Sequence, residues 1–185
     1  MKLSLKHIIT NIAMVITMAM FFQCKNNFKE VQQIGMLQNA PIGVAEDINL
    51  KYTDSGAITA NLISPKMLDY SNRDFGYSEF PEGINLILFD KDARKTIITS
   101  DYAVQFNESG LIDLRGNVVV ASHTKDSLFT EQLYYNQEIE WLFTDKPFEI
   151  KSSEINTYGL HLDSDIDFKD KRVIGMNDSD LKFEN

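Results

Sequence analysis

The stretch that decides the fold is IDLRGNVVV, at residues 112–120. Apolar and polar side chains alternate along it, with Ile112, Leu114, Val118 and Val120 on one side and Asp113, Arg115 and Asn117 on the other. A period of two residues is typical of a β-strand with one face in a core and the other in solvent. The stretch therefore predicts a half-buried strand.

The same alternation recurs on both sides of this strand, at residues 102–106, 139–143, 148–150, 166–168 and 181–183. Short turn signals such as Asp-Ser-Gly, Pro-Glu-Gly and Asp-Lys-Pro separate the runs, and no segment of the body has a helical period. Short strands joined by tight turns favour antiparallel pairing over parallel crossovers. We therefore expect an all-β domain made of stacked antiparallel hairpins, elongated and open.

Composition and charge exclude several classes of protein. The chain has 185 residues, of which 43% are hydrophobic and 11% aromatic, so it is too apolar to be disordered and has the length of one domain. Its formal net charge is -9, which opposes nucleic-acid binding and any bulk attraction to anionic lipid headgroups. Lipid binding would therefore have to come from a shaped apolar site.

The N-terminus carries a targeting signal. Lys2 and Lys6 precede an apolar run at residues 8–22, which at about 15 residues is shorter than the roughly 20 needed to span a membrane. The run ends at Cys24, so residues 1–23 are interpreted as a lipoprotein signal with Cys24 lipidated, or as an uncleaved anchor, because the preceding Gln23 is larger than such signals prefer. A buried, inert Cys24 is the third reading. Under either the lipoprotein or the anchor interpretation, we expect residues 24–46 to be a linker and residues 47–185 to be the domain.

Four runs in the body carry a family resemblance. They are LRGNVVV at 114–120, LFTEQLYY at 128–135, TDKPF at 144–148 and YGLHLD at 158–163. In this order and spacing they resemble the LptC family, the periplasmic component of lipopolysaccharide export, over roughly residues 48–175. The resemblance implies a β-jelly roll like that of LptA, with an interior groove for the acyl chains of lipopolysaccharide.

The resemblance also implies a function and partners. We expect a non-enzymatic protein, tethered on the periplasmic side of the inner membrane, that accepts lipopolysaccharide from the ABC transporter LptB, LptF and LptG and passes it to an LptA-like bridge. The inward-facing, lipid-binding side chains expected from the strand alternation are Leu86, Leu88, Ile112, Leu114, Val118, Val120, Leu133, Trp141, Phe143, Phe148 and Ile150.

Unpaired strand edges at both ends of such a domain favour partner contact by strand addition. By resemblance, the edge with Ile48, Leu50 and Tyr52 meets LptF and LptG, and the edge with Leu181 and Phe183 meets the LptA-like protein. Gly116 and Gly159 lie in matched motifs, where we expect a bulge or bend, and Gly159 is expected to support partner contact.

No reactive motif is visible, neither a G-x-S-x-G elbow nor a phosphate-binding glycine loop. The acidic run at 163–167 resembles the start of a calcium loop, but Phe168 occupies the position that needs Gly and Ile174 that of the bidentate Glu. We therefore expect no metal and no cofactor. Two other function classes remain open, an envelope lipoprotein acting as an interaction scaffold without lipid transport and a hydrolase of envelope polymers.

Overall fold

The chain is all-β in the part that the structure describes, residues 40–153 and 156–175. In this computed structural model these residues contain no helix, and the paired strands are antiparallel. The strands are β1 (Gly43–Asp54), β2 (Ala57–Asp69), β3 (Tyr77–Phe80), β4 (Ile84–Phe89), β5 (Lys95–Ser100), β6 (Tyr102–Phe106), β7 (Leu111–Ala121), β8 (Ser127–Asn136), β9 (Trp141–Thr144), β10 (Phe148–Lys151), β11 (Thr157–Gly159), β12 (His161–Asp165) and β13 (Lys171–Ile174). The predicted fold class is confirmed.

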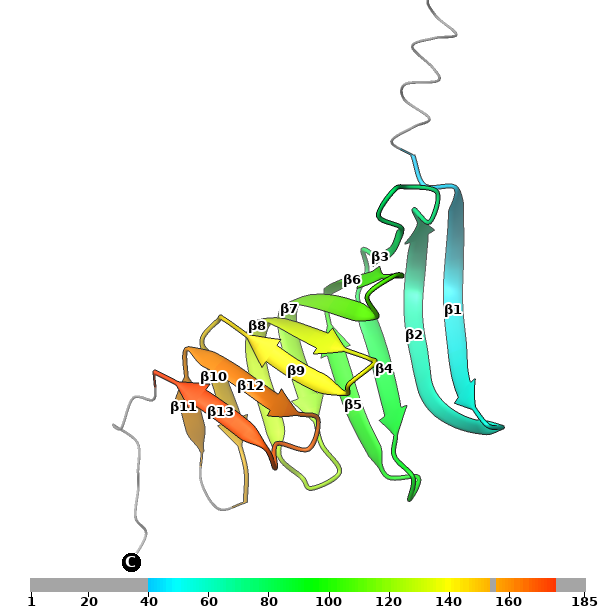
Figure 1. Cartoon of the computed structure of the whole chain (residues 1–185). Helices are drawn as coiled ribbons and strands as arrows, with labels where there is room; N and C mark the ends of the chain where they lie inside the picture. The colour runs from blue at the N-terminus through cyan, green and yellow to red at the C-terminus, as the bar shows by residue number, and fades with distance from the viewer. Residues whose placement is uncertain (1–39, 154–155, 176–185) are drawn as a thin grey trace, which may run out of the picture. The chain divides into compact units, whose positions relative to one another are not determined.

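Three long strands, β2, β7 and β8, change neighbour partway along their length. The first half of β7 pairs with β6 and its second half with β5. β8 pairs first with β10 and then with β9, and β2 pairs first with β4 and then with β3. The neighbouring strands therefore diverge into two layers that are joined along β2, β7 and β8 (Figure 1).

The first layer contains β3, β6, β9, β12 and β13, and the second layer contains β4, β5, β10 and β11. β1 pairs along the length of β2, and on its other side no strand of the described residues pairs with it. At the opposite end, β13 ends the first layer and β11 ends the second. Both layers thus run between an edge at β1 and edges at β11 and β13, as in a β-jelly roll.

A β-bulge marks the point at which β7 passes from one layer to the other. The pairing with β8 shifts register between Arg115 and Val118, and Gly116 and Asn117 have positive φ angles of 74° and 45°. A bulge bends and twists its strand, and Gly and Asn tolerate the left-handed conformation that it needs. The bulge or bend predicted at Gly116 is confirmed.

Apolar side chains of the two layers meet in one core. Phe80 of β3 and Leu142 of β9 come from the first layer, whereas Leu86 of β4 and Ile98 of β5 come from the second, and each is no more than 2% exposed. Burying a side chain of this size stabilises the fold by about 1.5–3 kcal/mol. The bend in the long strands therefore brings two apolar faces together that neither layer could cover alone.

Three expectations need correction. β1 begins at Gly43, so the first strand starts inside the segment 24–46 that was expected to be a linker. On β9, Leu142 is fully buried, whereas Trp141 and Phe143 are half-buried on the opposite face. The predicted inward orientation of Trp141 and Phe143 is therefore wrong. A turn at residues 137–140, in which Glu140 has a φ of 52°, precedes β9 where a continuous strand from 139 was expected.

Gly159 packs too closely for any side chain. A Cβ atom there would lie 2.6 Å from Cε1 of Phe148 and 2.8 Å from Cγ1 of Val173. We predict that Gly159→Ala lowers the free energy of unfolding by about 1–3 kcal/mol, the usual cost of overpacking, measured by urea unfolding of the purified protein. Gly43→Ala is the control, because its Cβ would make an ordinary 3.6 Å contact with Asp69. Equal effects of the two substitutions would contradict this prediction.

The two faces of β9 can be separated by neighbouring substitutions. Leu142→Ala leaves a cavity in the core and should lower the free energy of unfolding by about 2–5 kcal/mol. Phe143→Ala removes a half-buried ring that stacks on Tyr134 with centroids 4.9 Å apart, and should cost about 1–2 kcal/mol. Thermal and urea unfolding of both variants check the order, and a larger loss for Phe143→Ala would refute the orientation of the strand.

Candidate functional site

The structure brings together all but two of the residues predicted to bind lipid. Leu86 and Leu88 come from β4, Leu133 from β8, and the remainder from β7 and β10. The residues that meet in the interior are Leu86, Leu88, Ile112, Leu114, Val118, Val120, Leu133, Phe148 and Ile150. They form a continuous apolar lining between the two layers.

The interior is filled by its own side chains. The nine converging side chains are between 0% and 7% exposed. The lining also contains residues that the sequence reasoning missed, among them Leu128, Leu142 and Leu162, each fully buried. An acyl chain could therefore enter only if side chains or a covering segment moved, since packed interiors hold few voids larger than a water molecule.

Exposed apolar side chains gather on the hairpin of β1 and β2. Ile48 and Tyr52 are half-buried against the core, and Leu50, on the same face of β1, is 36% exposed. On β2, Ile58 and Ile63 are 45% and 36% exposed. Exposed apolar side chains therefore lie at the β1 edge, where Ile48, Leu50 and Tyr52 were predicted to contact a partner.

The other predicted partner edge is only partly described. Leu181 and Phe183 lie outside the described residues, as does Cys24, the predicted lipidation site. Within the described part, Leu160 lies between β11 and β12 and is 59% exposed, and Ile174 is the last residue of β13 and is 56% exposed. The Leu160 amide donates a hydrogen bond to the Ile174 carbonyl. Gly159 lies in β11, against Phe148 and Val173, so its first role is close packing.

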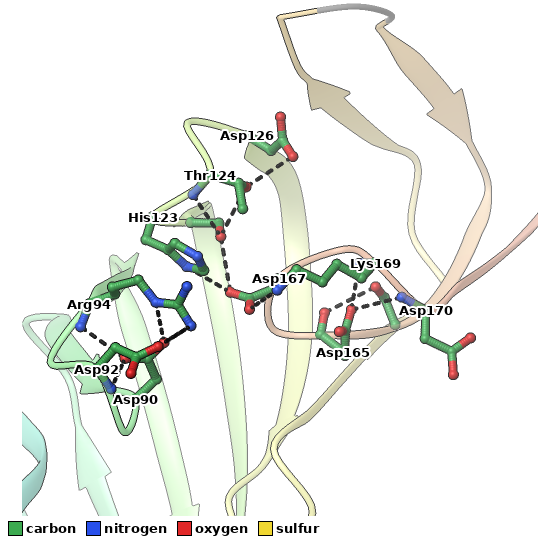
Figure 2. Close-up of polar contacts among 12 residues, drawn as sticks. Asp90, Asp92, Arg94, His123, Thr124, Asp126, Asp165, Asp167, Lys169 and Asp170 are labelled. Carbon is green, nitrogen blue, oxygen red and sulfur yellow. Dashed lines mark hydrogen bonds and ion pairs between the residues drawn. The ribbon is translucent and has the colours of Figure 1, made fainter.

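A polar cluster joins the turn between β7 and β8 to the turn between β12 and β13 (Figure 2). Asp167, in the turn between β12 and β13, lies 3.0 Å from Nδ1 of His123 in the turn between β7 and β8. It also accepts hydrogen bonds from Ser122 Oγ, at 3.2 Å, and from Lys169 Nζ, at 2.9 Å. No local sequence pattern predicts this cluster, because His123 and Asp167 are distant in the chain.

Burial alone would raise the pKa of Asp167, but its partners outweigh burial. The hydrogen bond from Lys169, the charge of His123 and the hydrogen bond from Ser122 together hold the pKa of the carboxyl below its ordinary value. Arg94, held by Asp90 in the turn between β4 and β5, also interacts with Asp167. The ionised carboxylate is thus the form that this cluster favours.

Ser122, His123 and Asp167 do not form a catalytic triad. In a triad the imidazole lies between the hydroxyl and the carboxylate and takes the hydroxyl proton. Here the Ser122 hydroxyl donates directly to the Asp167 carboxylate, which also contacts the His123 ring. The arrangement orders two turns and does not activate a nucleophile.

An open depression lies on the surface at β7, β8, β10 and β11. Its volume is about 400 Å³, and it reaches Val118 and Phe148 of the predicted set. Tyr158, at its rim, donates a 2.8 Å hydrogen bond to Glu149. Among residues 40–153 and 156–175, no group of three or more His, Cys, Asp or Glu side chains is placed to hold a metal ion.

Membrane attachment is not visible in the described part of the chain, where no helix has the length and hydropathy to cross a bilayer. No curated protein matches the chain. A family model does match, over residues 11–173, and its description is lipopolysaccharide-assembly, LptC-related. This match covers most of the chain and includes every described strand except the last residue of β13. The chain therefore belongs to the LptC family, whose periplasmic members are tethered to the inner membrane and take part in lipopolysaccharide transport.

Proposed function

We propose that this domain accepts the acyl chains of lipopolysaccharide from an inner-membrane ABC transporter and passes them to an LptA-like bridge. The observation that carries the proposal is the apolar interior, which runs between β1 and the strands β11 and β13, whose outer edges are not paired by any strand of the described residues. A path of this kind suits a molecule that is received at one end and released at the other.

The physical need for such an interior follows from the lipid. Each buried methylene contributes about 0.8 kcal/mol, so a single acyl chain resists transfer into water by roughly 10 kcal/mol. A carrier must therefore replace water along the whole chain, and it must do so without ionic contacts that would prevent release. Aliphatic and aromatic side chains form the larger part of the interior, beside buried hydroxyl side chains such as Thr144 and Ser164 and without a buried Lys or Arg among the described residues.

The two strand edges fit two partners. The edge of β1, with Ile48, Leu50 and Tyr52, is proposed to pair with the β-domains of LptF or LptG, which act with LptB. The edge at the other end, continuing toward Leu181 and Phe183, is proposed to pair with the LptA-like protein. Strand addition satisfies the free backbone groups of an edge and would continue the sheet from one protein to the next.

The tether is proposed to be either lipidated Cys24 or an uncleaved N-terminal segment. Either one holds the domain on the periplasmic face of the inner membrane, where the transporter delivers its lipid. The alternative of a scaffold without lipid contact is not favoured by membership of a lipopolysaccharide-transport family.

Tyr134 and Tyr135 provide a matched test of lipid contact. Tyr135 is 3% exposed and faces the interior, whereas the adjacent Tyr134 faces outward and stacks on Phe143. We predict that a photo-reactive phenylalanine analogue at Tyr135 forms an adduct with lipopolysaccharide in membranes when ATP is hydrolysed, and that the analogue at Tyr134 does not. Immunoblotting for lipopolysaccharide measures the adduct. Adducts at Tyr134 alone, from two folded variants, would overturn the proposal.

The β1 edge can be tested by co-purification. Leu50→Asp places a charge on the face of β1 that continues the core, while Asn49→Asp places the same charge on the opposite face. We predict that Leu50→Asp weakens co-purification of the transporter by about fivefold or more, which corresponds to roughly 1 kcal/mol, and that Asn49→Asp has little effect. Unchanged recovery with Leu50→Asp, at an unchanged melting temperature, would remove β1 from the interface.

A further inference from the structure

We propose that the 166–170 turn between β12 and β13 is a clasp over the point where an acyl chain enters the interior, with Phe168 occupying the position that the chain takes. The inference rests on the proposed lipid-carrying function and assigns the access point within it.

The turn lies between the free ends of the two layers. β7 begins in the first layer, passes through the bulge and ends in the second layer, at the end of that layer farthest from the bulge. The turn at residues 122–126 follows it there. The 166–170 turn belongs to the first layer, yet Asp167 contacts Ser122 and His123 of the second (Figure 2). The contact therefore bridges the side of the interior where no continuous strand of the described residues joins the layers.

Phe168 fills the space beneath this bridge. Its side chain is 4% exposed and belongs to the core, although Phe168 lies in a turn. Its φ angle is 58°, in the left-handed region that is unfavourable for a bulky residue, so the surroundings must hold it there. If the turn moved away, an acyl chain in the place of the Phe168 ring would restore the apolar contacts that the core loses.

Local hydrogen bonds would let the 166–170 turn move as a rigid unit. The Asp165 carboxylate accepts hydrogen bonds from the amides of Lys169 and Asp170, at 2.8 Å and 3.2 Å, and the Phe168 amide donates to the Asp165 carbonyl at 3.2 Å. These bonds tie the turn to the end of β12 and do not cross to the other layer. Opening must break the contacts of Asp167 with Ser122 and His123 and must withdraw Phe168 from the core.

Polar contacts make a suitable closure for a carrier. Hydrogen bonds and ion pairs at a partly exposed site exchange with water at small net cost, since both states are hydrogen-bonded. The side chains of Asp167 and His123 are 18% and 17% exposed, so water can reach both and replace the contact when it breaks. The polar contacts of the clasp therefore add little to the cost of opening, and the apolar contact of Phe168 is the part that an acyl chain would replace.

A reversible lock tests the clasp. Ser122→Cys combined with Asp167→Cys places one thiol at the Oγ position of residue 122 and the other near the Cγ position of residue 167, whose Oδ1 now lies 3.2 Å from that Oγ. The readout is the lipopolysaccharide adduct from the photo-reactive analogue at Tyr135, in membranes with ATP. Oxidation is expected to lower the adduct yield about tenfold, and reduction to restore it, because only the open state admits the chain. Mass spectrometry verifies the disulfide, and each single cysteine variant controls for pairing with Cys24.

A second variant weakens the clasp without new chemistry. Asp167→Ala is expected to raise the adduct yield about threefold through a larger open population. Asp145→Ala is the matched control, since it removes a carboxylate that lies 2.5 Å from Nδ1 of His161, at the other end of β12, and should leave the yield unchanged.

The outcomes separate the two proposals. Equal yields from the oxidised and reduced protein, or an unchanged yield in Asp167→Ala, would overturn the clasp and leave the carrier function in place. No adduct at Tyr135 in any state, including the parent without clasp substitutions, would overturn the carrier function and the clasp with it.

Discussion

The structure depends on the mutual burial of two apolar sheet faces. Each layer has one solvent-exposed face and one apolar face, and neither layer would be stable in water with its apolar face uncovered. The long strands β2, β7 and β8 solve this by running through both layers, so that one chain segment contributes to two faces that oppose each other. The bulge at Gly116 and Asn117 is where that requirement is met in β7.

The same construction leaves strand edges open. A closed barrel would pair every edge, but in the described part of the chain the two layers end at β1 on one side and at β11 and β13 on the other. Free edges invite aggregation, so they are usually blunted or used for partners. Here exposed Leu50 and Ile174 lie at the two ends, and the acidic net charge of -9 opposes unspecific self-association.

The two-residue alternation of apolar side chains predicted the buried face correctly in β7, where Ile112, Leu114, Val118 and Val120 all face inward. It misled where an alternating run crossed a turn. Residues 139–143 and 166–168 keep a period of two, yet the structure has turns at 137–140 and 166–170, with Glu140 and Phe168 at positive φ. Non-glycine residues give little local signal for that conformation. The contact of Asp167 with His123 depends on how the layers fold over each other, which no local pattern encodes.

A filled interior is compatible with carrying lipid. An empty apolar trough would expose its lining to water whenever the carrier was unloaded, at about 25 cal/mol for each Å². A carrier that waits in an aqueous compartment therefore gains by covering its lining with its own side chains, as Phe168 and its neighbours do here. Transfer depends on the difference in free energy between the packing of the protein's own side chains and their packing against an acyl chain. Both kinds of packing are contacts between apolar groups. In the proposed carrier, a small difference in free energy would let lipid both enter and leave, which a permanently open and tightly binding groove would not allow.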